Sequence, residues 1–175
     1  MLLTQVVVKS VALNYRDLII ARGGYPFAQR DGVVPASDAS GVVEAVGSKV
    51  HRFKTGDKVL TLFNQGHLSG SVDSYSVATG TGGVIDGGLQ QYGAFDEQGL
   101  VHMPKNLDFV EGSTLTCAAL TAWNGLYGGV RRLTPGDWVL TQGTGGVSIF
   151  ALQVSRHGAQ SHDGHMLIRK TMIVC

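Results

Sequence analysis

A glycine-rich loop between a short apolar strand and an apolar helix is the feature that most constrains how this chain can fold. The strand, residues 138–140, is rich in β-forming side chains and follows a Pro-Gly-Asp turn at 135–137. The loop carries glycine at 143, 145 and 146, which leaves backbone N–H groups open to a pyrophosphate at the start of the next helix. The segment therefore predicts a phosphate-binding β–α unit.

The loop departs in one place from the usual dinucleotide-binding fingerprint. Its pattern is Gly-x-Gly-x-x-Ser, so Ser148 stands where a third glycine normally permits close packing of helix on strand. The chain contains 25 glycines, so a plain structural turn is the alternative to a cofactor loop. The strand-loop-helix order favours the cofactor. The helix is expected to begin near Gly146 and to bury Val147, Phe150, Ala151 and Val154.

Composition excludes several classes of protein. The 175 residues, 43% apolar, suffice for one ordinary domain or two small lobes. A formal charge of +1 without a basic stripe gives no support for a nucleic-acid partner. No apolar run reaches the length of about 18 residues that crosses a bilayer, and the N-terminus lacks a signal-peptide pattern. The sequence thus predicts a cytoplasmic protein with no membrane partner.

The first hundred residues consist mostly of short β-rich runs separated by turns. Strands are expected within residues 5–13, 41–47, 54–60, 89–95 and 100–103. One helix is expected after Asn14 as N-cap, with Asp17 in its first turn and its end at Gly23. Residues 64–88, rich in Gly, Ser, Thr and Asp, predict a long surface loop. Residues 1–105 are therefore interpreted as an all-β lobe.

Residues 106–160 change to a helix-strand-helix pattern. Asp108 followed three residues later by Glu111 predicts a capped helix start, and the apolar run 115–126 predicts a long, mostly buried helix. This helix would connect the β lobe to the glycine-loop unit. Cys117 lies within it and is expected to be a small buried core residue rather than a nucleophile; with Cys175 as the other cysteine, the sequence favours reduced thiols.

Five stretches, taken together and in this order, resemble the zinc-independent, quinone-oxidoreductase-like branch of the medium-chain dehydrogenase/reductases. They are Ala-Leu-Asn-Tyr-Arg-Asp at 12–17, Pro-Ala-Ser-Asp at 35–38 with the glycine-bounded strand 41–47, Phe-Lys-Thr-Gly-Asp-x-Val at 53–59, Leu-Thr-Ala-Trp at 120–123, and Thr-Gln-Gly-Thr-Gly-Gly-Val-Ser at 141–148. The resemblance implies a fold between α+β and α/β: a GroES-like β lobe at 1–105, then the start of a Rossmann domain at 106–160. It also implies hydride transfer between NADP or NAD and a small carbonyl, enone, quinone or alcohol.

The resemblance further implies which residues form the site. Asn14 and Tyr15 would be catalytic, in the cleft that holds substrate and nicotinamide, and Thr121 would lie near the nicotinamide. The cofactor-binding loop would comprise Gly143, Thr144, Gly145, Gly146, Val147 and Ser148. Each of the first three has a structural alternative: Asn14 as a helix cap, Tyr15 as a core aromatic, and Thr121 as a helix residue bonded to the preceding turn.

The zinc ligands of related enzymes are missing from the expected places. Zinc members of the family use a Cys near the first helix and a Gly-His-Glu motif, where this chain reads Asn-Tyr-Arg-Asp at 14–17 and Pro-Ala-Ser-Asp at 35–38. No cysteine precedes Cys117, so the cysteine-rich loop of the structural zinc is absent too. His157, His162 and His165 near Cys175 do not have a standard metal-binding spacing. The sequence therefore predicts no metal site, and catalysis would rely on positioning and hydrogen-bond donors.

The resemblance ends near residue 160. A Rossmann sheet needs several parallel strands covered on both faces, and residues 106–160 supply one. Asp163 lies twenty residues after Gly143, where an acidic residue would bind the cofactor ribose, but no apolar strand precedes it. Neither an NAD nor an NADP preference can be deduced. Residues 161–175 are expected to be a disordered tail outside the family.

These features predict a truncated family member. Its first strand starts almost at Met1, so a preceding strand of the β lobe is expected to be absent. With an incomplete cofactor domain, the chain is expected to bind nicotinamide cofactor weakly and to turn over no substrate. A homo-oligomer is expected only with a complete cofactor domain. The alternative is a non-catalytic fragment or a GroES-like binding module, and the missing part of the cofactor domain is the feature that separates this alternative from the oxidoreductase. Micromolar NADPH affinity with enone reduction by the purified chain would contradict the expected inactivity.

Overall fold

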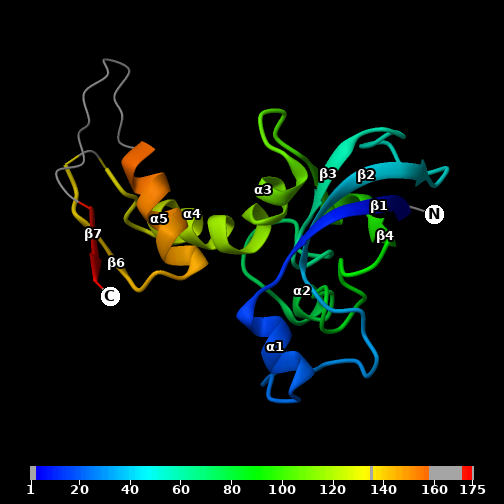
Figure 1. Ribbon diagram of the computed structural model, residues 1–175, viewed down its shortest axis with the longest axis horizontal. Helices are drawn as coiled ribbons and strands as arrows, with labels where there is room; N and C mark the ends of the chain where they lie inside the picture. Colours follow the sequence, from blue (N-terminus) through cyan, green and yellow to red (C-terminus); the bar gives the residue numbers. More distant parts are fainter. Residues whose placement is uncertain (1–2, 135, 158–170, 175) are drawn as a thin grey trace. The chain divides into compact units, whose positions relative to one another are not determined.

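The computed structural model describes residues 3–134, 136–157 and 171–174 and contains two compact units, Met1–Cys117 and Ala118–Cys175. The first unit holds β1 to β5 and α1 to α3, and the second holds α4, β6, α5 and β7 (Figure 1).

An antiparallel five-stranded sheet in the order β4-β1-β2-β3-β5 forms the first unit. Its strands are β1 (Leu3–Ala12), β2 (Asp38–Val46), β3 (Lys58–Thr61), β4 (Tyr92–Asp96) and β5 (Leu100–His102). Each falls in a stretch whose β-rich pattern predicted a strand, to within a few residues. Side chains from these strands, together with Phe53 from the segment between β2 and β3, meet in a core of Val6, Val43, Phe53, Val59, Phe95 and Leu100.

The helix α1 (Tyr15–Ala21) has the termini that the sequence predicts. Asn14 is its N-cap, and the Asp17 carboxylate accepts a hydrogen bond of 2.8 Å from the Asn14 backbone N–H. After its end, Gly23 has a φ of 70°, in the left-handed region that glycine adopts without strain.

Residues 64–88 are more ordered than the sequence predicted. They contain α2 (Ser74–Val77) and two β-bridges, Asn64 with Gly80 and Thr81 with Ile85. Thr81 is fully buried, and its hydroxyl donates to the backbone carbonyl of Phe63 at 2.9 Å. The surface-loop prediction holds for residues 68–75, which are exposed, and is wrong for residues 80–83 and 87–88, which are buried. Polar side chains here satisfy backbone groups inside the unit, whereas the sequence pattern equates polarity with exposure.

The predicted long helix is interrupted. It begins as α3 (Phe109–Ser113), with the capping box of Asp108 and Glu111 that the sequence predicted, continues as a π-helical turn at Leu115–Ala119, and ends as α4 (Leu120–Tyr127). The expectation of a mostly buried helix was also wrong for α4, where Ala122 is buried but Leu120 and Trp123 are each 55% exposed. Apolar spacing alone does not reveal whether another element covers a helix face.

The second unit contains the predicted glycine-loop segment. The strand β6 (Val139–Gln142) leads through the loop into α5 (Gly146–His157), which packs on α4. Contrary to expectation, Val147 is 43% exposed. Residues 171–174, within the stretch expected to lack structure, form β7 (Thr171–Val174), which pairs in parallel with β6 (Figure 1). The rest of that stretch lies outside the described residues.

Candidate functional site

The pairing of β1 with β2 brings Asn14 to Asp38. The ladder between these strands ends with Ala12 opposite Asp38, so the chain that leaves β1 passes beside the start of β2. There the Asn14 Nδ2 donates to Asp38 Oδ2 at 3.1 Å, and the Ser37 hydroxyl donates to Asp38 Oδ1 at 3.0 Å. Asn14 is thus both the cap of α1 and the partner of a carboxyl that is 1% exposed. The structural and functional interpretations of Asn14 are compatible.

Burial raises the pKa of the Asp38 carboxyl above its ordinary value, and the nearby charge of Asp17 raises it further. Hydrogen bonds from Asn14 and Ser37 act in the opposite direction because they stabilise the ionised form. Burial outweighs them. Asp38 is therefore a buried carboxyl that retains its proton to higher pH than a solvated aspartate does.

Asp38 should make the stability of the first unit depend on pH. A folded-state pKa above the unfolded value contributes stability that is fully present below about pH 3.9, the ordinary aspartate value, and is lost as pH rises through the raised pKa. Asp38→Asn removes this titration. The difference in urea midpoint between the native chain and Asp38→Asn is expected to change across that pH window, and the Asp38 ¹³Cγ chemical shift should titrate there in the native chain. Two results would contradict a raised pKa for Asp38: urea midpoints of the two proteins that change with pH in the same way, and an Asp38 ¹³Cγ shift that titrates at the ordinary aspartate value.

Thr116 and Cys117 complete the polar cluster, and the sequence pattern did not reveal this role. The Thr116 hydroxyl lies close enough to Asp38 to favour the ionised carboxylate, yet this buried Oγ1 has no hydrogen-bond partner within the described residues. Burial raises the pKa of the Cys117 thiol, and the charge of Asp38 adds to that effect. Cys117 is half-buried and has a free thiol. Both residues were expected in a helix interior, and only the tertiary contact links them to Asp38.

Tyr15 is 74% exposed, so the alternative of a core aromatic is wrong for this residue. Thr121 is exposed on α4. The predicted alternative for Thr121, a bond from its hydroxyl to the preceding turn, is not found in the part of the chain that the structure describes. Exposure leaves both side chains accessible to a ligand.

The glycine loop is open where a cofactor phosphate would approach. Gly143 has a φ of 80°, and a Cβ at Gly143 or Gly145 would meet no atom of the described residues within 4 Å. The Ser148 hydroxyl donates to the backbone carbonyl of Gln142 at 2.7 Å, which ties the helix start to the end of β6. A Cβ at Gly146 would lie 3.3 Å from the Cβ of Ala118, so this glycine permits close packing within the unit. The loop residues fit a pyrophosphate held by backbone N–H groups.

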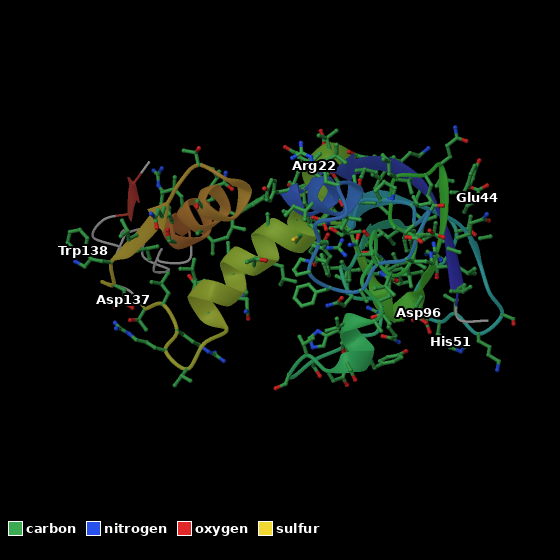
Figure 2. The ribbon with its side chains drawn as sticks, turned by 90° about the horizontal axis from the view of Figure 1, so that it is seen from below. Arg22, Glu44, His51, Asp96, Asp137 and Trp138 are labelled. Carbon is green, nitrogen blue, oxygen red and sulfur yellow. The ribbon has the colours of Figure 1, made fainter. Side chains whose placement is uncertain are left out.

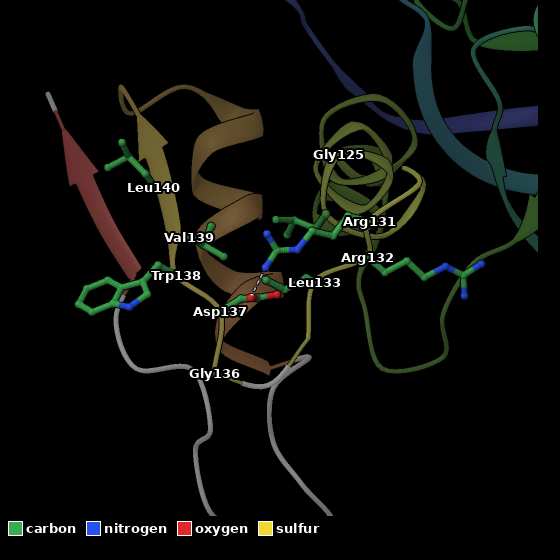
Figure 3. A pocket seen from close by; sticks show the side chains of 10 residues that line it. Gly125, Arg131, Arg132, Leu133, Gly136, Asp137, Trp138, Val139 and Leu140 are labelled. Carbon is green, nitrogen blue, oxygen red and sulfur yellow. Dashed lines mark hydrogen bonds and ion pairs between the residues drawn. The ribbon is translucent and has the colours of Figure 1, made fainter.

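A separate pocket lies near the start of β6, where the chain enters the strand, whereas the glycine loop follows the end of the strand. The pocket has a volume of about 520 Å³, and Asp137 and Trp138 come from the segment that leads into β6 (Figures 2 and 3). Arg131 Nη2 forms an ion pair of 2.7 Å with Asp137 Oδ1. The pKa of Asp137 is held below its ordinary value by the backbone N–H and hydroxyl of Thr134 and by Arg131. This ion pair connects Arg131, which precedes the turn, to Asp137, which leads into β6.

The donor set of the Asp38 cluster does not match a zinc site. Such a site takes three or four Cys, His or carboxylate ligands, and Asp38 and Cys117 are two candidates among neutral Asn14, Ser37 and Thr116 side chains. Within residues 3–134, 136–157 and 171–174, no group of three or more His, Cys, Asp or Glu side chains could hold a metal ion. His162, His165 and Cys175 lie outside the described residues.

In the part of the chain that the structure describes, no helix is long and apolar enough to span a membrane.

Comparison with known proteins identifies relatives of both units. The alcohol dehydrogenase GroES-like domain matches residues 3–105. A zinc-type alcohol dehydrogenase-like protein of Schizosaccharomyces pombe is 48% identical over 146 residues, which cover 83% of this chain and 42% of that protein. The crotonyl-CoA carboxylase/reductase of Cereibacter sphaeroides is 34% identical over 163 residues, 85% of this chain and 38% of that protein.

Solved structures agree. A structure from Sinorhizobium meliloti, named as an alcohol dehydrogenase, matches with a TM-score of 0.82 and 36% identity, over 98% of this chain and 48% of that one. A quinone oxidoreductase of Pseudomonas syringae shares the fold, with a TM-score of 0.70 and 24% identity. The chain thus spans about half the length, or less, of these relatives. The fold and the relatives confirm the predicted resemblance to the medium-chain dehydrogenase/reductases, and the chain belongs to their alcohol dehydrogenase family, with its GroES-like domain at residues 3–105.

Proposed function

We propose that this chain is part of an NAD(P)-dependent oxidoreductase that transfers a hydride to or from a small carbonyl, enone, quinone or alcohol without zinc. The observation that carries the proposal is the open glycine loop between β6 and α5, where Gly143 has a positive φ and a Cβ at Gly143 or Gly145 would meet no atom of the described residues within 4 Å. Relatives named as alcohol dehydrogenases and as a crotonyl-CoA carboxylase/reductase support the reaction class.

The residues of the chain would act by binding and positioning. The backbone N–H groups of residues 143–148 would hold the pyrophosphate, and Thr121 would contact the nicotinamide, which supplies or accepts the hydride when bound. Asn14 and Tyr15 would position the substrate and donate hydrogen bonds to its oxygen, where negative charge develops. Asp38 would fix the Asn14 amide through their 3.1 Å hydrogen bond.

Zinc independence rests on the chemistry of the cluster. Asn14 and Ser37 are poor zinc ligands, and burial of the Cys117 thiol disfavours the thiolate that a metal requires. Elemental analysis of the purified chain after dialysis against zinc tests this point. Less than one tenth of an equivalent of zinc is expected, and a stoichiometric ion lost in Cys117→Ser would contradict it.

The 175-residue chain by itself should bind cofactor weakly and turn over no substrate. The described part of the second unit pairs two strands, β6 and β7, whereas nicotinamide-binding sheets use more strands to hold the loop and the ribose. Calorimetry with NADPH and NADH and an enone-reduction assay measure both expectations. Micromolar affinity together with turnover would overturn this part of the proposal.

Gly145→Val tests the loop itself. The side chain would fill space that is empty in the folded chain, so the fold should be unchanged while the phosphate is blocked. Millimolar NADPH should shift the amide resonances of residues 143–148 in the native chain, and Gly145→Val should reduce apparent affinity at least tenfold, which corresponds to about 1.4 kcal/mol. Gly125→Ala is the control, since its Cβ would also meet no atom within 4 Å in the described part of the chain. Equal shifts in all three proteins, or none at these residues, would contradict the assignment.

The second candidate, a non-catalytic GroES-like binding module, is favoured by one observation. The first unit is compact by itself and has its own core. Turnover by a longer version of the chain with a complete cofactor domain would support the oxidoreductase. Ligand binding without turnover in that longer version would support the module.

A further inference from the structure

Within the part of the chain that the structure describes, three glycines directly follow an aspartate or an asparagine. The pairs are Asp31-Gly32, Asp86-Gly87 and Asn124-Gly125. Glycine has no side chain to shield its backbone nitrogen, and its backbone reaches conformations that other residues avoid. The nitrogen can therefore attack the side-chain carbonyl carbon of the preceding residue and close a succinimide ring. The reaction needs a side chain that is free to rotate and a glycine N–H that is not hydrogen-bonded.

The pair at 31–32 meets both conditions. Asp31 is exposed, and its side chain forms no hydrogen bond or ion pair with the described residues. Gly32 is exposed too, and its N–H donates to no acceptor in the described ranges. A Cβ at Gly32 would meet no atom of the described residues within 4 Å, so a ring has room to form at this position.

The same pair occupies the middle of a turn that opens easily. The Val33 N–H donates to the Arg30 carbonyl at 3.3 Å, beyond the usual range for this kind of hydrogen bond. Gly32 has a φ of 68°, in the left-handed region. An exposed turn closed by so long a bond opens locally at little cost. Opening lets the Asp31 carboxyl rotate toward the Gly32 nitrogen.

The two other pairs are protected by the fold. The Asp86 carboxylate accepts a hydrogen bond of 2.9 Å from the Val34 N–H and forms an ion pair with Arg30. Gly87 is buried, and its N–H donates to the Val34 carbonyl at 2.7 Å. Gly125 lies inside α4, where the backbone N–H groups belong to the helix ladder. The structure thus separates one reactive pair from two protected pairs of the same sequence type.

We propose that Asp31 is a modification site, at which aspartate isomerises spontaneously to isoaspartate. The Gly32 nitrogen attacks Asp31 Cγ: the N–Cγ bond forms, the Cγ–OH bond of the protonated carboxyl breaks, and the hydroxyl leaves with the amide proton as water. Water then adds at either ring carbonyl and reopens the ring to aspartate or isoaspartate. No oxidant, cofactor or partner takes part, so the proposal does not depend on the oxidoreductase assignment.

The modification should loosen the segment around the turn. Isoaspartate adds one carbon to the backbone of the turn and leaves a free α-carboxylate there. The turn is anchored on both sides, because the Arg30 N–H donates to the Gly83 carbonyl at 2.8 Å and the Val34 N–H donates to Asp86. A longer turn between these anchors cannot keep the same geometry. The amide resonances of Arg30 and Val34 should therefore shift as isoaspartate accumulates.

The test incubates the purified, folded 175-residue chain in H₂¹⁸O at neutral pH, where each reopening of the ring places one ¹⁸O atom in the residue. Peptide mapping by mass spectrometry locates the label. Asp31 should acquire ¹⁸O about tenfold faster than Asp86, because the hydrogen bonds at Asp86 and Gly87 must open first. In urea, where the fold is lost, the two rates should become similar. Labelling of Asp31 no faster than that of Asp86 in the folded chain would overturn the proposal.

Two variants separate the ring chemistry from folding. Asp31→Glu keeps the charge but lengthens the side chain, so it should abolish both the label at this position and the slow shifts of Arg30 and Val34. In Gly32→Asn the left-handed backbone is retained, since asparagine also adopts it, while the side chain shields the nitrogen and should slow labelling about tenfold. If Gly32→Asn does not fold, the comparison of Asp31 with Asp86 decides. Absence of NADPH binding with normal labelling of Asp31 would overturn the proposed function alone.

Discussion

Replacing Gly41 with alanine is expected to destabilise the first unit by about 3 kcal/mol, the upper end of the usual cost of overpacking a core. A Cβ at this position would lie 2.4 Å from the backbone oxygen of Val7 and 2.5 Å from Val6 Cγ1. Gly41 faces Val8 in the ladder between β2 and β1, so neither backbone can move without disturbing the central strand pair. Urea unfolding followed by circular dichroism measures the loss.

Gly24→Ala is the matched control for this substitution. Its Cβ would meet its nearest neighbour, Ile19 Cγ2, at 3.6 Å, which is ordinary van der Waals contact. Gly24→Ala should therefore change the urea midpoint little. If Gly41→Ala were no less stable than Gly24→Ala, the close approach of β1 and β2 at this position would be wrong.

Replacing Asp17 with alanine should cost about 2–3 kcal/mol, because it leaves two backbone N–H groups without their acceptor, each at a cost on the order of 1–2 kcal/mol. Asp17 is 7% exposed, and its carboxylate accepts hydrogen bonds from the backbone N–H groups of Asn14, at 2.8 Å, and Ala36, at 3.2 Å. Ala36 is fully buried with a φ of 69°, a conformation that alanine rarely adopts. Asp17 thus helps to hold a strained residue in place.

A control variant, Asp31→Ala, and the backbone amide resonances near Ala36 test this role of Asp17. Asp31 is exposed and its side chain forms no hydrogen bond or ion pair with the described residues, so Asp31→Ala should leave the urea midpoint nearly unchanged. Amide resonances of Ala36 and of its neighbour Ser37 should shift in Asp17→Ala. An equal midpoint in the two variants, or an unchanged Ala36 resonance, would show that the two hydrogen bonds do not stabilise this part of the fold.

Local patterns predicted most of the secondary structure. Strands β1 to β6 followed from β-branched and apolar runs bounded by turns, since each run is short and specified by its own residues. The ends of α1 and the start of α3 followed from their capping residues, because a cap acts within three or four positions of the chain. The strand-loop-helix order of β6, the glycine loop and α5 was confirmed for the same reason.

The errors have one physical cause. The buried Thr81 and the α2 helix lie in a stretch interpreted as a surface loop, because the partner of a polar side chain is not visible in the sequence. The exposed Trp123 lies in a helix expected to be buried, because burial depends on what packs against a helix. In both cases, burial is decided by whether elements distant in the chain pack against the residue.

The candidate site divides in the same way. By itself the sequence determined the family, the β-rich first lobe and the glycine loop, since these depend on residue types at short spacing. Only the tertiary structure decided that Asn14 donates to the buried Asp38, and that Arg16 is held between Tyr25 and Phe63. Asn14 and Asp38 are 24 positions apart, and Arg16 and Phe63 are 47 positions apart, so pairing of strands is what brings these groups together.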